Sequence, residues 1–358
     1  MLLKKLELVN YRNIEKACLK TDDALNLLIG DNAQGKTNIL EAIWYCSSAK
    51  SFRGAKEKDV VLFGEKEAKI SAEFDIDSII HTIDIKIAKN GVKTLLHNQC
   101  PLKKLSDVAG LFLSVIFTPE HLALVKEGPG QRRRFADIAL CLLYPRYIYC
   151  LNRYNKTLEQ KNAALRACAK NGASHDTLDI WDSRLAALGT EIIKYRREYI
   201  SDIAVFAAEY HNKISEDSEK LEIEYEQSIN AQTKEEYMAL LLKQRKDDLF
   251  TGSTSAGIHR DDIKINLNGT QARFFASQGQ QRSIVISLKL AEAKKAEEIC
   301  RQKPIVLLDD ILSELDKKRR AFILDAVEDY QVFLTGTECD LFFAGKSFTI
   351  KRGEVFDN

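Results

Sequence analysis

The sequence lacks a surplus of either charge, because 53 lysines and arginines stand against 52 aspartates and glutamates in 358 residues. Bulk charge therefore gives no sign of a nucleic-acid-binding protein, and any such surface must be local. Long apolar runs are also lacking, since stretches such as 111–117 are far too short to span a bilayer. The N-terminus, residues 1–7, carries charges where a signal peptide needs an apolar core. We therefore expect a soluble, cytoplasmic protein with no membrane partner.

Cysteine pairs at CxxC spacing are absent, although the chain has eight cysteines. Without such a pair, a zinc site of standard spacing is not expected. The eight are Cys18, Cys46, Cys100, Cys141, Cys150, Cys168, Cys300 and Cys339. Scattered cysteines in a chain of this size are typical of reduced thiols in a cytosolic protein rather than of disulfides.

Strand patterns occupy both ends of the chain. Leu25–Ile29 is a short apolar run typical of a buried strand, and residues 70–74 and 79–87 alternate between apolar and polar. Towards the other end, Ile263–Leu267 and Ile305–Leu308 also predict strands.

The middle of the chain, from about residue 119 to 244, has few glycines and prolines and predicts helices. Apolar residues recur at helical spacing over 184–210, and a loop between helices is expected at 171–174. The simplest interpretation is one α/β domain built from residues 1–118 and 251–358, with a mainly helical domain, 119–250, inserted between them. Three consecutive domains are the alternative.

Residues 30–37 fit the G-x-x-x-x-G-K-S/T pattern of a phosphate-binding loop, placed between a predicted strand and a helix that opens at Lys36. The glycines let the loop curl, so that its N–H groups and the helix N-terminus face phosphates. Lys36 supplies a charge for the β- and γ-phosphates of ATP, and Thr37 supplies a hydroxyl for Mg²⁺. The predicted ATP-binding residues of the loop are Gly30, Asp31, Asn32, Ala33, Gln34, Gly35, Lys36 and Thr37.

Two carboxylates, Asp309 and Asp310, follow the apolar run 305–308. A strand of this kind lies beside the phosphate-loop strand and projects an acid towards the metal. We predict that Asp309 is a Mg²⁺ ligand and that Asp310 polarises the attacking water as a general base. A solvated acidic turn is the alternative. A domain built from both chain ends lets these acids meet Lys36 and Thr37, whereas three consecutive domains would separate them.

The segment 277–282, Ser-Gln-Gly-Gln-Gln-Arg, begins another predicted helix. Ser277 suits an N-cap, and Gly279 keeps the helix start open to an anion. We expect this helix to reach phosphates that are bound to a second copy of the protein. An ordinary capped helix is the alternative.

The order of phosphate loop, long insertion, S-x-G-Q signature and paired acids resembles the ABC-type heads of SMC-like DNA repair ATPases. Within that group the chain resembles the RecF family. The resemblance spans nearly the whole chain and is carried by residues 8–13, 30–38, 50–53, 119–128, 132–137, 257–262, 277–282 and 307–316. Two positions depart from the family pattern: Ile258 stands where proline is usual, and His121 where an acid is usual.

The resemblance implies that Ser277, Gly279 and Gln280 contact the γ-phosphate in the opposing subunit, and that Asn38 and Arg53 line the nucleotide pocket. It implies an ATP-dependent homodimer that binds double-stranded DNA at junctions with single-strand gaps. Slow, DNA-stimulated hydrolysis would release that DNA. RecR would be the partner in DNA replication, repair and the SOS response, with RecO and RecA in the pathway.

Basic residues concentrate where the helical insertion opens, at Arg132, Arg133, Arg134, Arg146, Arg153, Lys156, Lys161 and Arg166. Phosphate contacts need such charge, although a run of this kind is usually a solvated face balanced by acids. The resemblance favours DNA contact.

Other functions fit the same motifs. One is an ATP-gated DNA clamp without catalysis, against which the intact acidic pair argues. Another is the ATPase subunit of a transporter, for which the long insertion is unusual. The span between residues 119 and 251 is far too short for the arms of a long coiled-coil SMC protein.

Overall fold

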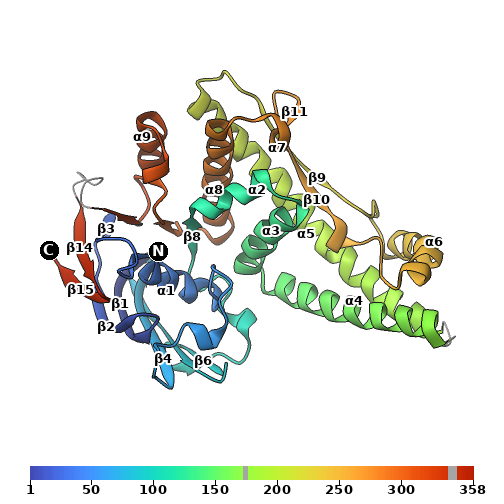
Figure 1. Cartoon of the computed structure of the whole chain (residues 1–358), viewed down its shortest axis with the longest axis horizontal. Coiled ribbons are helices and arrows are strands. Elements are labelled where there is room, and N and C mark those ends of the chain that lie inside the picture. The colour runs from blue at the N-terminus through green and yellow to red at the C-terminus, as the bar shows by residue number, and fades with distance from the viewer. Residues whose placement is uncertain (172–175, 338–344) are drawn as a thin grey trace. The chain divides into compact units, whose positions relative to one another are not determined.

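The computed structural model describes residues 1–171, 176–337 and 345–358, which form two compact units (Figure 1). Unit 1 comprises Met1–Leu122 and Arg282–Asn358, and unit 2 comprises Ala123–Gln281. Cys339 and residues 172–174 of the expected inter-helix loop lie outside the described residues. None of the seven described cysteines forms a disulfide bond. None of the described helices combines the length and the apolar character that crossing a membrane requires.

Unit 1 contains a six-stranded sheet in the order β15-β14-β3-β13-β12-β8. Its strands are β3 (Leu25–Ile29), β8 (Ser114–Phe117), β12 (Ile305–Leu308), β13 (Val332–Gly336), β14 (Lys346–Lys351) and β15 (Glu354–Asp357). All but β15 run parallel to their neighbours, which explains the continuous apolar runs in the sequence. Strands from both chain ends therefore share one sheet, as predicted, and β3 and β14 lie side by side in Figure 1. The strand before the paired acids was expected beside β3, and this was wrong, because β13 lies between β3 and β12.

A second, antiparallel sheet of unit 1 has the order β2-β1-β4-β5-β6-β7. Its strands are β1 (Leu2–Tyr11), β2 (Ile14–Lys20), β4 (Glu67–Ile76), β5 (Ile79–Ala88), β6 (Lys93–His97) and β7 (Cys100–Pro101). Helix α1 (Lys36–Ser48) packs against strands of both sheets and buries Ile39, Leu40 and Ile43 completely. The helix after the phosphate loop is thus fixed by apolar contacts on two sides.

The remaining helices of the chain are mostly those of unit 2. They are α2 (Ala123–Lys126), α3 (Pro129–Leu143), α4 (Pro145–Asn171), α5 (Asp176–Ser215), α6 (Lys234–Thr251), α7 (Ala272–Phe275), α8 (Gln278–Cys300) and α9 (Lys317–Ala326). Short 3₁₀ turns occur at Glu57–Asp59, Leu105–Val108, Pro119–Leu122, Ile258–Arg260 and Leu312–Glu314. Helix α8 begins in unit 2 and continues into unit 1, and α9 belongs to unit 1.

Unit 2 also contains a three-stranded sheet, β11-β10-β9, and this corrects the expected domain boundary at residue 250. Strand β10 (Asp262–Leu267) pairs antiparallel with β9 (Leu221–Glu226) along its whole length, and β11 (Thr270–Gln271) extends the sheet. Because β9 lies within the insertion, the pairing draws residues 251–281 into unit 2. The strand itself was predicted correctly, but its partner was not.

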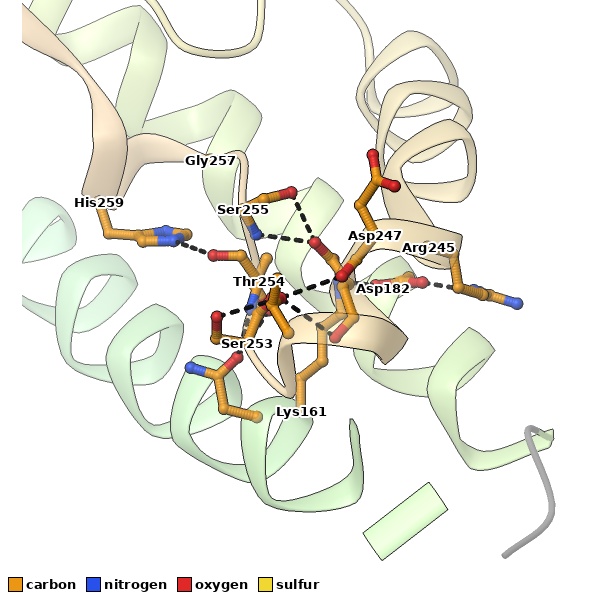
Figure 2. Close-up of polar contacts among 12 residues, drawn as sticks. Lys161, Asp182, Arg245, Asp247, Ser253, Thr254, Ser255, Gly257 and His259 are labelled. Carbon is orange, nitrogen blue, oxygen red and sulfur yellow. Dashed lines mark hydrogen bonds and ion pairs between the residues drawn. The ribbon is translucent and has the colours of Figure 1, made fainter. Parts of the chain in front are cut away.

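A buried ionic cluster joins α4, α5 and α6 of unit 2 (Figure 2). The fully buried Lys161 places its Nζ 2.9 Å from Asp182 Oδ1 and 3.0 Å from Asp248 Oδ2. Arg245 donates to the second oxygen of Asp182 at 2.6 Å. Lys161 is therefore a structural residue and does not belong to the basic surface expected from the sequence. Arg132 is also buried, and it makes two hydrogen bonds, of 2.7 and 2.8 Å, to Asp262.

Replacement of Lys161 by Met should destabilise the protein by about 3–5 kcal/mol, because two buried carboxylates would lose their shared cation. Urea unfolding followed by circular dichroism measures this change. Lys156→Met on the exposed side of the same helix is the control and should change stability by no more than about 0.5 kcal/mol. Equal stability of the two variants would contradict a structural role for Lys161.

Candidate nucleotide-binding site

The phosphate loop runs from the end of β3 into α1, and two of its positions require glycine. At Gly30 a Cβ atom would lie 2.4 Å from the carbonyl oxygen of Ile350. Gly35 has a φ of 121°, and its Cβ would lie 3.0 Å from Asn13 Oδ1. Among the described residues, no side chain caps α1. The N–H of Asn38 donates to the Gly35 carbonyl oxygen at 3.0 Å, which leaves the N–H groups of Lys36 and Thr37 to face an anion.

Lys36 bends back over this loop. Its Nζ donates to the carbonyl oxygen of Gly30 and, at 3.2 Å, to that of Asp31. Burial lowers the pKa of Lys36, while nearby carboxylates, chiefly that of Asp310, act in the opposite direction. The present partners of the ammonium group are neutral carbonyl oxygens, so a phosphate oxygen would be a stronger one.

Thr37 and Asp309 come together from opposite ends of the chain. Thr37 Oγ1 donates to Asp309 Oδ1 at 2.9 Å, and Thr335 Oγ1 donates to the same oxygen at 3.1 Å. Burial raises the pKa of Asp309, and these two hydrogen bonds act in the opposite direction. A hydroxyl beside a carboxylate is a set of hard oxygen donors, which fits Mg²⁺.

Asp310 differs from Asp309 in being exposed. Its φ of 50° lies in the left-handed region, which is unusual for a residue other than glycine. Its N–H donates to Thr335 Oγ1 at 2.8 Å, so one threonine holds both acids. The turn leaves the Asp310 carboxylate on the cavity wall, free of the hydrogen bonds that occupy Asp309.

These residues line a cavity of about 920 Å³ in unit 1. Its wall consists of Arg12, Asn13, Asn32, Ala33, Gly35, Lys36, Thr37, Asn38, Arg53, Lys58, Asp59, Val61, Phe63, Lys89, Asp309, Asp310 and Thr335. The structure thus brings most of the expected unit 1 residues together, including Asn38 and Arg53, whose side chains are 3.2 Å apart.

Three expected loop residues are not among the residues that line the cavity, but they bond to residues that do. Gly30 and Asp31 receive Lys36, as described above, and Gln34 is held from two directions. Asn13 Nδ2 donates to the Gln34 carbonyl oxygen at 3.1 Å, and the N–H of Gly353 donates to the same oxygen at 3.0 Å. The loop is therefore braced by the β1–β2 turn and by the C-terminal hairpin.

The signature residues Ser277, Gly279 and Gln280 belong to unit 2 and are not among the residues that line this cavity. The N-cap predicted at Ser277 is confirmed. The N–H of Gln280 donates to Ser277 Oγ at 3.3 Å, and the N–H of Ser277 donates to Gln280 Oε1 at 2.7 Å. Ser277 is exposed at this end of α8.

The sequence patterns did not identify Arg12, Asn13 or Thr335 as site residues. Arg12 makes two hydrogen bonds, of 2.7 and 2.6 Å, to the fully buried Glu41 of α1. The sequence did hold a signal for Arg12 and Asn13. This pair stands between two strand patterns, within the segment 8–13 that carries the family resemblance. Thr335 lies near the end of an apolar strand, and only the order of the strands reveals its position.

Phe63 was also missed, and it is 97% exposed on the cavity wall. The Nζ of Lys89 lies 6.0 Å from the centroid of its ring. Because Phe63 is almost entirely in solvent, it contributes little to the core. Its flat aromatic face offers a stacking surface for a nucleotide base.

The whole chain was compared with known proteins. Residues 2–343 match the family model described as the RecF/RecN/SMC N terminal domain. The Smc head domain of Pyrococcus furiosus, 14% identical, superposes with a TM-score of 0.57 over 100% of this chain and 96% of that one, which shows the fold alone. The fold and the site together define an SMC-head type of P-loop ATPase domain with an inserted second unit.

Other relatives are much more similar. The DNA replication and repair protein RecF of Clostridium novyi (strain NT) is 42% identical over 339 residues, which cover 94% of this chain and 93% of the relative. RecF of Agathobacter rectalis is 40% identical over 99% of each chain. The solved structure of the recombination mediator protein RecF with ATP in the RecFOR pathway is 36% identical. It superposes with a TM-score of 0.93 and covers 100% of this chain and 97% of that chain. This chain belongs to the RecF family.

Replacement of Lys36 by Arg should reduce ATP turnover by about 100-fold or more. The planar guanidinium cannot fold back into the space of an ammonium group that lies against two loop carbonyls. Steady-state phosphate release measures the effect, and Lys20→Arg on the exposed side of β2 serves as the control. Unchanged turnover in the Lys36 variant would remove this residue from the site.

Replacement of Phe63 by Ala should weaken ATP binding by about 1–3 kcal/mol, the usual value of one aromatic–base stack. Binding of inorganic tripolyphosphate should stay unchanged, because the phosphate loop is intact. Isothermal titration with both ligands tests this, and Phe63→Tyr should retain ATP affinity. An equal loss for ATP and tripolyphosphate would contradict base stacking.

Proposed function

We propose that this protein binds ATP with Mg²⁺ in the unit 1 cavity and hydrolyses it. The observation that carries the proposal is the 2.9 Å contact between Thr37 and Asp309 beside Lys36. This contact places a cation, a hydroxyl and a carboxylate at the end of a glycine-bent loop, which is the set of groups that a metal–triphosphate needs.

Each group of the site has a distinct part in the proposed reaction. The loop N–H groups and Lys36 bind the β- and γ-phosphates, and Thr37 and Asp309 hold the metal. Bound Mg²⁺ supplies positive charge that stabilises the developing charge on the phosphoryl oxygens. Asp310, which is exposed on the cavity wall, accepts the proton of the attacking water.

In this proposal a second copy of the chain completes the site. Ser277, Gly279 and Gln280 of the opposing copy contact the γ-phosphate, so that ATP joins two heads. Two features support this: the capped end of α8 is exposed, and Phe274 and Phe275 immediately before it are 66% and 73% exposed. Exposed aromatic neighbours suit a surface that becomes covered on dimerisation.

The ATP-bound dimer binds duplex DNA near single-strand gaps, and slow, DNA-stimulated hydrolysis releases it. In the cytoplasm it acts with RecR, and RecO and RecA follow in the pathway, so that RecA replaces single-strand-binding protein. The family relatives support this proposal, since they are named as DNA replication and repair proteins and the solved relative belongs to the RecFOR pathway.

Replacement of Ser277 by Arg should abolish ATP-dependent dimerisation and leave ATP binding by the monomer nearly unchanged. The long cation would fill the position at which the opposing γ-phosphate is expected. Sedimentation velocity with and without ATP and duplex DNA measures association. Phosphate release, measured in parallel, distinguishes an ATPase that hydrolyses ATP repeatedly from a clamp without catalysis.

Ser201→Arg on the exposed face of α5 is the matched control and should dimerise normally. Loss of ATP binding by the Ser277 variant monomer would show that the signature helix does not act on a partner's nucleotide. A wild-type protein that stays monomeric with ATP would contradict the dimer itself.

A further inference from the structure

The buried and exposed sides of helix α4 differ sharply in composition. The buried side repeats at helical spacing and consists of Tyr147, Cys150, Tyr154, Thr157, Lys161, Leu165 and Cys168. Beyond Pro145, the exposed positions up to residue 166 are Arg146, Tyr149, Asn152, Arg153, Asn155, Lys156, Glu159, Gln160, Ala163 and Arg166. Four of these ten side chains are basic and one is acidic. The exposed side therefore carries a net positive charge, although the whole chain is nearly neutral.

Helix α6 of the same unit shows that this excess belongs to α4. The charged side chains that α6 exposes are Lys234, Lys243, Lys246, Glu235, Glu236 and Asp247. These three bases and three acids cancel, as a solvated helix face usually does. The α4 face therefore differs from the balanced face of α6, and its net positive charge suits a partner of negative charge.

Three of the four bases on this exposed side of α4 are not neutralised by carboxylates. Within the described part of the chain, Arg153, Lys156 and Arg166 form no ion pair. The guanidinium carbon of Arg153 lies 5.6 Å from the ring centroid of Tyr149, and its Nε is 3.4 Å from the Tyr149 hydroxyl. This contact restrains Arg153 without cancelling its charge. Arg146 differs, since it lies 3.1 Å from a carboxylate oxygen of Glu191.

The opposite side of α4 is anchored, which keeps the exposed side chains at fixed spacing. Lys161 is bound between Asp182 and Asp248, and the neighbouring Asn162 Oδ1 accepts two hydrogen bonds of 2.8 Å from Thr254 (Figure 2). Residues 146–166 are part of one uninterrupted helix, so the face is about 30 Å long at 1.5 Å per residue. That length is close to one turn of a DNA duplex, which is about 34 Å.

We propose that the exposed face of α4, centred on Arg153 and Lys156, binds the phosphate backbone of duplex DNA. Arg, Lys, Asn, Gln and Tyr side chains are the usual donors to phosphate oxygens, and they make up most of this face. The face follows the backbone and carries no code for base sequence. The inference rests on the DNA-binding function proposed above and adds the surface that performs it.

The full-length double variant Arg153→Gln/Lys156→Gln tests the proposal. Fluorescence anisotropy with a random-sequence duplex, measured with ATP over a series of KCl concentrations, gives Kd and its salt dependence. Two lost phosphate contacts should lower the slope of log Kd against log salt by about 1.8 and weaken binding by about tenfold or more. The control Lys234→Gln/Lys243→Gln removes the same charge from the balanced helix α6 and should bind DNA as the wild type does.

The outcomes separate this inference from the function on which it rests. If the wild type does not bind the duplex, the proposed DNA function falls and the surface with it. If the wild type binds the duplex and the Arg153→Gln/Lys156→Gln variant binds it as tightly as the wild type does, the α4 face is not the DNA surface. A loss of binding to polyglutamate but not to DNA would assign the face to an acidic protein and overturn the proposal. Unchanged ATP affinity in both variants excludes a general folding defect.

Discussion

The hydrogen bond from Thr37 to Asp309 is the contact on which the nucleotide site depends. It joins residues that are 272 positions apart in the sequence. The bond forms because β13 lies between β3 and β12 with all three strands parallel, so that their C-terminal ends meet at one edge of the sheet. Thr335 on the central strand contacts both acids from that position. A shift of one residue in the register of β12 would turn the Asp309 carboxylate to the opposite face and dismantle the site.

Contacts from distant parts of the chain hold the proposed phosphate loop in place. Asn13 and the C-terminal turn at Arg352 and Gly353 all donate to Gln34. Arg12, which precedes Asn13 in the same turn, donates to both carboxylate oxygens of the buried Glu41 and so ties this turn to α1. Contacts from both chain ends therefore determine the loop conformation, and a braced loop loses less conformational entropy on binding than a mobile one.

Features that depend on neighbouring residues could be predicted from the sequence, and features that depend on distant pairing could not. The strand at 25–29, the loop, the helix after it and the strand before the acids were predicted, because apolar runs and glycine spacing are local signals. The membership of β10 in unit 2 was missed because it depends on pairing with β9. Thr335 was missed for the same kind of reason, since its role depends on strand order. Phe63 was missed because nothing in the sequence distinguishes an exposed phenylalanine from a buried one.

The basic run of the insertion shows how helical phase determines what a charge does. Lys161 lies in register with Tyr154 and Leu165, so its side chain enters the core, where two aspartates neutralise it. Arg153 and Lys156 lie out of that register and remain in solvent. Removing the buried cation would leave Asp248 without its cation and Asp182 with Arg245 alone. Removing an exposed cation costs the fold almost nothing. A cation that the fold does not need is found where solvent or a negatively charged partner can neutralise it. Burial therefore separates the structural cation of α4, Lys161, from the cations that face outward.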